Sequence, residues 1–182
     1  MKIFPTAADY KRVFILALCA FVLGIALSSC IGGFYFKVRG PSMEPTIHDG
    51  DRVLLLWTRS EPIRGSVVTV TVLDPDTQEV GNWIKRVIGL PGETVTILFG
   101  EHPVQIDGKD LDEPYLMGAR IFYNVDEAGT WKLKDDEYFI MGDNRLMSKD
   151  SRRIGPIKKS QIRKVLDIWW TVLGMHGEVV SW

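Results

Sequence analysis

The chain has 182 residues, of which 46% are hydrophobic and 25% are charged, and its formal net charge at pH 7 is -1. This length fits one globular domain with a short appendage. The balanced charge gives no reason to expect nucleic acid as a partner. Both cysteines, Cys19 and Cys30, lie in an apolar N-terminal run. The rest of the chain therefore has no disulfide, no thiol nucleophile and no cysteine-based metal site.

The apolar run from Val13 to Phe36 contains no charged residue and is long enough to cross a bilayer as a helix. We predict a single transmembrane anchor over residues 13–36, preceded by a short cytoplasmic N-terminus over residues 1–12. Basic residues flank both ends of the run, and Lys2 with the amino terminus favours the N-terminus inside. Two alternatives stay open, a cleaved secretory signal and a lipoprotein signal, because Leu27–Cys30 is similar to a lipobox.

The chain after residue 36 alternates short apolar or β-branched runs with Gly, Pro and Asp turns, which is typical of β-structure. The predicted strands are Arg52–Trp57, Ser66–Leu73, Asn82–Leu90, Thr94–Leu98, a hairpin over Pro103–Lys109, Glu137–Met141 and Gln161–Leu173. The stretch over about residues 99–134 is more polar, and it forms either a small inserted lobe or long hairpin loops. We therefore expect a mainly β domain over residues 37–182.

Ser42 is a candidate nucleophile because of the turn on which it lies. Pro41 and Pro45 bracket it so closely that no helix can run through it, and Gly40 adds a site with little steric restriction. A serine hydroxyl is a poor nucleophile alone and needs a base. Another segment of the chain must supply that base.

Lys85 is the candidate base, because it lies in the middle of a predicted strand. Strand alternation places it on one face between Trp83 and Val87, with Arg86 on the other face. Desolvation between apolar neighbours lowers the pKa of a lysine. A lysine that is neutral near pH 7 can accept a serine proton, whereas one with the ordinary pKa of ~10.4 does so poorly. The alternative is that Lys85 extends from a strand edge to water.

The three histidines give a weaker case for a base. His48 follows a turn, His102 lies in the polar stretch and His176 lies in a glycine-flanked loop. A Ser-His-Asp triad needs only spatial proximity, but none of these segments is typical of one. They also lack the spacing of metal ligands on a helix. We interpret them as surface or capping residues.

The segment Gly142–Arg152 gathers carboxylates, hydroxyls and guanidiniums directly after a predicted strand. Asp150 and Arg152 are placed to form an ion pair that fixes this loop. Ser148 is placed to hydrogen-bond the base and hold its rotamer, as a third group does in triads. The alternative is an ordinary solvated polar loop.

Together these segments resemble the type I signal peptidases, which are membrane-bound Ser-Lys endopeptidases. The resemblance covers essentially the whole chain, and the short length is similar to the Gram-positive bacterial members. It rests on motifs in the expected order, namely Gly40–Thr46, Gly50–Val53, Ile84–Glu93, Asp112–Tyr115 and Gly142–Arg152.

The resemblance implies that Ser42 is the catalytic nucleophile and Lys85 the general base. It implies that Ser148 orients the lysine amine and that Asp150 and Arg152 hold the site together. The implied reaction is the cleavage of N-terminal signal peptides from exported preproteins that carry small residues at the -1 and -3 positions.

The resemblance also implies two antiparallel sheets forming the catalytic core, on the extracytoplasmic side of the cell membrane. Met43 is expected to line the substrate pocket, and no metal or other cofactor is expected. The implied partners are preproteins and the lipid bilayer. Two departures occur: Gly40 stands where some members have a hydroxyl residue that donates to the oxyanion, and Leu146–Met147 stand where polar residues are common.

Two rival functions are considered. One is a dedicated pilus or surface-protein assembly factor, or a peptidase of the same fold, that acts mainly by binding its partner. The presence of Ser42, Lys85 and Ser148 argues against a purely binding role. The other is a self-cleaving repressor with a Ser-Lys site, which would carry a DNA-binding region where this chain has its apolar run.

Overall fold

The computed structural model describes residues 16–17, 34–55, 61–117 and 121–166. The chain divides into two compact units, Met1–Gly33 and Phe34–Trp182. Within the described ranges, no helix is long and apolar enough to cross a membrane. Most of the predicted anchor lies outside these ranges, as do residues 167–173 of the last predicted strand.

The second unit begins with an antiparallel ribbon of β1 (Phe34–Lys37) and β2 (Arg52–Leu55). In its register Phe36 lies opposite Val53. The prediction that the anchor helix extends to residue 36 is therefore wrong. Aromatic side chains favour a pleated strand, and β2 supplies the hydrogen-bonding partner that the sequence alone did not reveal.

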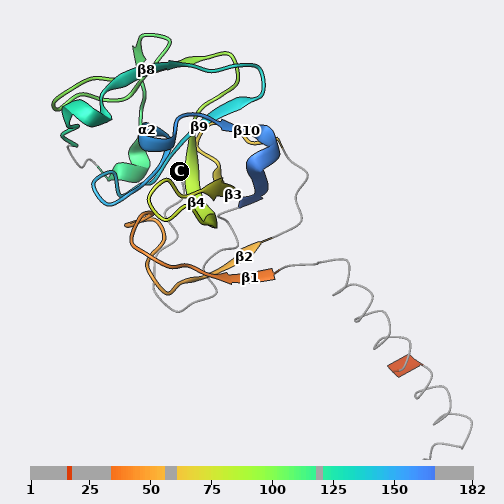
Figure 1. The fold of residues 1–182 in the computed structure, drawn as a ribbon. Helices are drawn as coiled ribbons and strands as arrows, with labels where there is room; N and C mark the ends of the chain where they lie inside the picture. Colours follow the sequence, from red (N-terminus) through yellow and green to blue (C-terminus); the bar gives the residue numbers. More distant parts are fainter. Residues whose placement is uncertain (1–15, 18–33, 56–60, 118–120, 167–182) are drawn as a thin grey trace, which may run out of the picture. The chain divides into compact units, whose positions relative to one another are not determined.

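A five-stranded sheet forms the centre of the second unit, with the strand order β10-β9-β4-β3-β11 and every pairing antiparallel. Figure 1 shows β3, β4 and β9 between the β1–β2 ribbon and β8. Residues 84–89 of β4 are all buried, so this end of the strand is covered on both faces. The strands are β3 (Val67–Leu73), β4 (Val80–Gly89), β9 (Glu137–Met141), β10 (Ile157–Lys158) and β11 (Ile162–Leu166).

A four-stranded sheet of order β7-β6-β5-β8 contains much of the polar stretch. It begins at Thr94, before the predicted start of the lobe near residue 99. Its strands are β5 (Thr94–Ile97), β6 (Gln105–Ile106), β7 (Lys109–Asp110) and β8 (Gly129–Lys132). The short helices are η1 (Pro114–Leu116), η2 (Val125–Glu127), α2 (Ser151–Ile154) and η3 (Lys159–Gln161).

The predicted mainly antiparallel β fold is confirmed, but the described residues form three sheets instead of two. Of the ribbon, β2 was predicted and β1 was missed, because β1 lies within the apolar run. Strand β8 was missed because Gly129 and Thr130 carry no apolar alternation.

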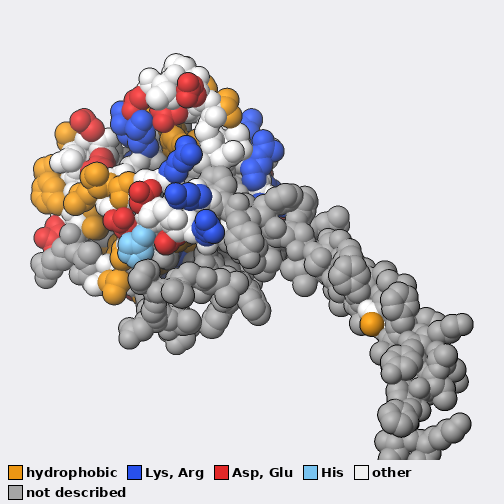
Figure 2. All heavy atoms as spheres, turned by 90° about the horizontal axis from the view of Figure 1, so that it is seen from below, with side chains coloured by type: hydrophobic (Ala, Val, Ile, Leu, Met, Phe, Trp, Pro, Cys, Tyr) orange, Lys and Arg blue, Asp and Glu red, His pale blue; other side chains and the backbone are white. Residues whose placement is uncertain are grey.

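Three apolar clusters form the core. One packs the two larger sheets through Ile88, Val95 and Phe139, and a second surrounds β3 and Val87. The third joins the Ser42 turn to the strands through Met43 and Ile84. Both acidic and basic side chains lie among apolar ones on the surface in Figure 2.

Candidate active site

Ser42 lies on a tight turn between β1 and β2 that two buried side chains anchor. Met43 is 1% exposed and Ile47 is 4% exposed, and both pack in the third cluster. The amide of Ile47 donates to the Met43 carbonyl at 2.9 Å, and the amide of Asn144 donates to the Ser42 carbonyl at 3.1 Å. The apolar residues therefore fix the turn to the core, and the loop after β9 fixes it from the other side.

Lys85 reaches Ser42 from the central strand β4. Its Nζ donates a 2.7 Å hydrogen bond to Ser42 Oγ, although the two residues are 43 positions apart. The lysine side chain is buried, and its Nζ lies 5.6 Å from the centre of the Trp83 ring. The structure thus brings together the two predicted catalytic residues at hydrogen-bonding distance, with the amine on the strand face that alternation predicted.

The surroundings of Lys85 favour its neutral form. Burial is the main cause, and it lowers the pKa of Lys85 from its ordinary 10.5 to about 8. The negative charges of Asp150 and Asp143 oppose this effect, while the positive charge of Arg152 adds to it. With a pKa of about 8, roughly a tenth of the amines are neutral at pH 7, compared with well under a thousandth for an ordinary lysine.

Gly142 makes the approach of the two segments sterically feasible. A Cβ at this position would overlap both the Ser42 carbonyl oxygen and the Ser148 hydroxyl. Ser148 therefore lies beside the Ser42 turn. Its hydroxyl, however, donates at 3.4 Å to the Lys149 carbonyl, and it makes no hydrogen bond to Lys85. The orienting role of Ser148 stays a prediction.

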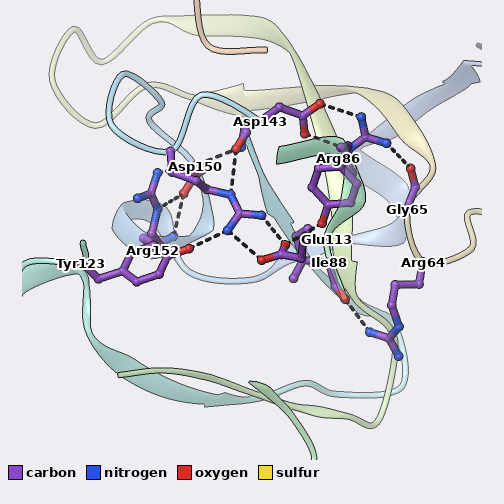
Figure 3. A network of polar contacts seen from close by, with 12 residues as sticks. Arg64, Gly65, Arg86, Ile88, Glu113, Tyr123, Asp143, Asp150 and Arg152 are labelled. Atoms are coloured by element: carbon purple, nitrogen blue, oxygen red, sulfur yellow. Dashed lines mark hydrogen bonds and ion pairs between the residues drawn. The ribbon is translucent and has the colours of Figure 1, made fainter. Parts of the chain in front are cut away.

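The predicted ion pair of Asp150 and Arg152 is present and buried (Figure 3). Arg152 Nε donates to Asp150 Oδ1 at 2.8 Å, and its Nη2 donates to Oδ2 at 2.9 Å. Asp150 Oδ2 also accepts the Gly142 amide at 3.0 Å, and Arg152 pairs with Glu127 at 2.6 Å. The pair therefore holds Gly142 in place and ties the loop to η2.

A second buried ion pair, between Arg86 and Asp143, was not predicted. Two guanidinium nitrogens of Arg86 donate to the two Asp143 oxygens at 2.8 and 2.6 Å. Thr46 Oγ1 donates to Asp143 Oδ2 at 2.6 Å. Arg86 Nη1 donates to the Gly65 carbonyl at 2.8 Å (Figure 3). Both partners appear in the sequence as charges in apolar or turn segments, but only the folded chain pairs them.

A third buried arginine, Arg145, was also missed. Its side chain is fully buried and pairs with Glu113 through two nitrogens. It also donates to the Tyr123 hydroxyl at 2.6 Å and to the Gly142 carbonyl at 3.1 Å. The signal in the sequence was an arginine inside the loop motif next to the apolar Leu146–Met147, both of which are exposed.

Other sequence expectations concern Met43, Gly40 and the histidines. Met43 packs in the core, and its role in lining a substrate pocket stays a prediction. Gly40 has a φ of +87°, a conformation that disfavours any residue with a side chain, and its amide donates to Asp49 Oδ1 at 2.8 Å. His48 and His102 are exposed, while His176 lies outside the described residues. In the part of the chain that the structure describes, no group of His, Cys, Asp and Glu could hold a metal ion.

The family model and the similar proteins that match this chain are signal peptidases. The model of the family described as signal peptidase, peptidase S26, matches residues 9–170. Signal peptidase I of Bacillus amyloliquefaciens is 37% identical over 156 residues, which is 79% of this chain and 80% of that protein. Signal peptidase I S of Bacillus subtilis is 38% identical over 157 residues, which is 79% of this chain and 81% of that one.

Among solved structures, a signal peptidase I from Enterococcus faecalis matches with a TM-score of 0.47 and 29% identity, over 60% of this chain and 99% of that chain. The chain belongs to the signal peptidase family, peptidase S26.

Proposed function

We propose that this protein is a membrane-anchored serine endopeptidase that removes signal peptides from exported preproteins, with Ser42 as nucleophile and Lys85 as general base. The observation that carries the proposal is the 2.7 Å contact between Ser42 Oγ and a buried lysine amine whose pKa is lowered to about 8. Membership of a serine endopeptidase family supplies the reaction class.

In the acylation step, the neutral Lys85 amine accepts the Ser42 proton as Oγ attacks the scissile carbonyl carbon. The Ser42 backbone amide is the proposed donor to the oxyanion, and the second donor is unassigned because Gly40 has no side chain. The Lys85 ammonium then protonates the leaving amine as the peptide bond breaks. The product is an ester between Ser42 Oγ and the signal peptide.

In the deacylation step, Lys85 takes a proton from a water molecule as that water attacks the ester carbonyl. Collapse of the intermediate returns the proton to Ser42 Oγ and releases the carboxyl end of the signal peptide. Asp150 and Arg152 are proposed to hold the loop around the dyad, Ser148 to orient the Lys85 amine, and Met43 to line the substrate pocket. The same lysine serves both steps, so no metal is needed.

The anchor is proposed on the apolar residues from Val13 to Gly33, a stretch that is still about 20 residues long. The peptidase unit would then lie on the extracytoplasmic side of a single-pass membrane protein. Confining enzyme and membrane-bound preprotein to one plane would raise their effective concentration without new contacts.

The direct test is to incubate the detergent-extracted full chain with a panel of preproteins and to sequence the new N-termini. The wild type should cleave after small residues, while Ser42→Ala and Lys85→Ala should remain folded and inactive. Binding of a preprotein without cleavage by the wild type would instead favour an assembly factor.

A further inference from the structure

The segment Glu113–Tyr115, which we call the bridge segment, has no role in the proposed chemistry. It precedes and enters the short helix η1, between the strands β7 and β8 of the four-stranded sheet. The Glu113 side chain is nevertheless only 7% exposed, which is unusual for a glutamate unless it is paired. The contacts of Glu113 and Tyr115 lead to the two segments that hold the dyad.

The first contact of the bridge segment leads to the Ser42 turn. The Glu113 carboxylate accepts hydrogen bonds from two nitrogens of Arg145, one of them at 3.2 Å. Arg145 in turn donates from Nε to the Gly142 carbonyl at 3.1 Å. Gly142 packs so tightly against the Ser42 carbonyl that a Cβ there would overlap it. Glu113 is therefore the charge partner of the arginine that holds this close approach.

The second contact leads to the strand that carries Lys85. The Tyr115 ring lies 4.1 Å from the guanidinium carbon of Arg86, the residue after Lys85 on β4. The Tyr115 hydroxyl donates to Glu113 Oε1 at 2.6 Å, so the contact with Arg86 and the contact with Arg145 are joined within the bridge segment. Arg86 also holds Asp143, so the lysine strand and the serine-side loop share one support. Figure 3 shows Glu113 in this network with Arg86 and Asp143.

We propose that Glu113 and Tyr115 are positioning residues that set the distance between Ser42 and Lys85 by holding Arg145 and Arg86 from one short segment. This inference rests on the proposed function of the dyad. The reacting atoms must be aligned closely, since a misplacement of about 1 Å can cost roughly 100-fold in rate. A segment that touches both supports is suited to keep that alignment.

The first test compares kcat and KM of full-length variants in detergent on one preprotein. Glu113→Gln keeps the side-chain shape but removes the charge, and kcat should fall by roughly 10- to 100-fold with a much smaller change in KM. Tyr115→Phe keeps the ring over Arg86 and should cost less than Tyr115→Leu. The control Glu137→Gln breaks an ion pair with Lys134 at the start of β9 and should leave kcat within about twofold.

A double variant separates positioning from simple stabilisation. Glu113→Gln with Arg145→Met removes both buried charges, so the melting temperature should return close to that of the wild type. The Gly142 carbonyl loses its donor, Arg145 Nε, in this double variant, so kcat should stay at least about tenfold below that of the wild type. Recovery of kcat together with stability, or a folded Glu113→Gln variant with normal kcat, would overturn the proposal.

A further experiment that does not depend on cleavage measures the pKa of the Lys85 amine by NMR titration. Neither Glu113 nor Arg145 is among the charges that shift Lys85, which are Asp150, Asp143 and Arg152. Loosening of the site in Glu113→Gln should therefore raise the pKa of Lys85 by admitting water. An unchanged pKa would contradict the bridge. A wild type that cleaves nothing would count against the proposed function, while the titration would still decide the role of the bridge.

Discussion

The two segments that meet at Gly142 are held by different forces. The Ser42 turn is anchored by apolar packing of Met43 and Ile47 in a cluster with the neighbouring strands. The loop after β9 is anchored by buried arginine–carboxylate pairs that involve Asp143, Arg145 and Asp150. Apolar packing tolerates substitutions that conserve volume, whereas a buried ion pair loses most when a single partner is removed.

This difference matches what each segment has to do. The turn presents one small side chain, and its shape depends on prolines and core packing. The loop must place Gly142 against the turn and must set the charges around Lys85. Asp143 and Asp150 favour the ammonium form of Lys85 and Arg152 disfavours it, so the ion pairs adjust the pKa of Lys85 as well as the geometry.

The largest effect on stability is expected for Asp143→Ala, which breaks one of the buried ion pairs that anchor the loop after β9. Arg86, which is only 5% exposed, would lose its bidentate partner and remain charged. The free energy of unfolding should fall by about 3–5 kcal/mol, and cleavage should fall with it. Urea titration measures the loss. A loss below about 1 kcal/mol would show that the pair does not anchor the loop.

Lys85→Met should have the opposite effect on stability. The folded pKa of about 8 lies below the ordinary 10.5, so folding below pH 8 carries a protonated amine into a buried site. Removing the amine should abolish cleavage and stabilise the protein at pH 7 by up to ~3 kcal/mol. Between about pH 8 and 10.5 the unfolded wild type binds the extra proton, so wild-type stability should rise and the difference should shrink. An equal difference at both ends of this window would contradict the burial argument.

A smaller effect on stability is expected for a substitution in the apolar packing of the Ser42 turn. Met43→Leu conserves volume and should cost less than about 1.5 kcal/mol, measured by the same urea titration. The prediction that Met43 lines the substrate pocket can be read from the same variant. A changed preference at the -1 or -3 position with unchanged kcat on the best substrate would support that role, and an unchanged preference would make Met43 a packing residue.

The smallest effect on stability is expected at the tip of the loop. Leu146 and Met147 are 70% and 65% exposed, unlike the buried charges on both sides of them. Replacing both with serine should change the free energy of unfolding by no more than about 0.5 kcal/mol. A larger loss would mean that the ion pairs alone do not hold the loop.

Much of the fold followed from the sequence because alternation and turn residues are local signals. β3, β4, β5 and β9 appeared within one or two residues of the predicted bounds. β2 also begins at the predicted Arg52, but β1 and β8 were not predicted, because their formation depends on pairing partners distant in the chain. An aromatic run such as Phe34–Phe36 suits a membrane helix and a strand equally well until its partner is known.

Candidate site residues could be chosen from the sequence where one residue type lies in one distinctive local environment. Ser42 on a proline-bounded turn and Lys85 in the middle of a strand became candidates in this way. The structure joins them at 2.7 Å, and their catalytic roles stay predictions. The partners of Arg86 and Arg145 were not found, because each ion pair joins segments more than 30 residues apart. Which carboxylate meets which arginine is decided by tertiary packing, which no local pattern encodes.

The central claim is that Lys85 is the general base, and the pH dependence of kcat/KM for preprotein cleavage tests it most directly. This profile reports the pKa values of the free enzyme. With burial holding the pKa of Lys85 at about 8, the ascending limb should have its midpoint near pH 8, and Ser42→Ala should show no activity at any pH. A midpoint near the histidine value of ~6.5, or near the ordinary lysine value of ~10.4, would contradict the assignment.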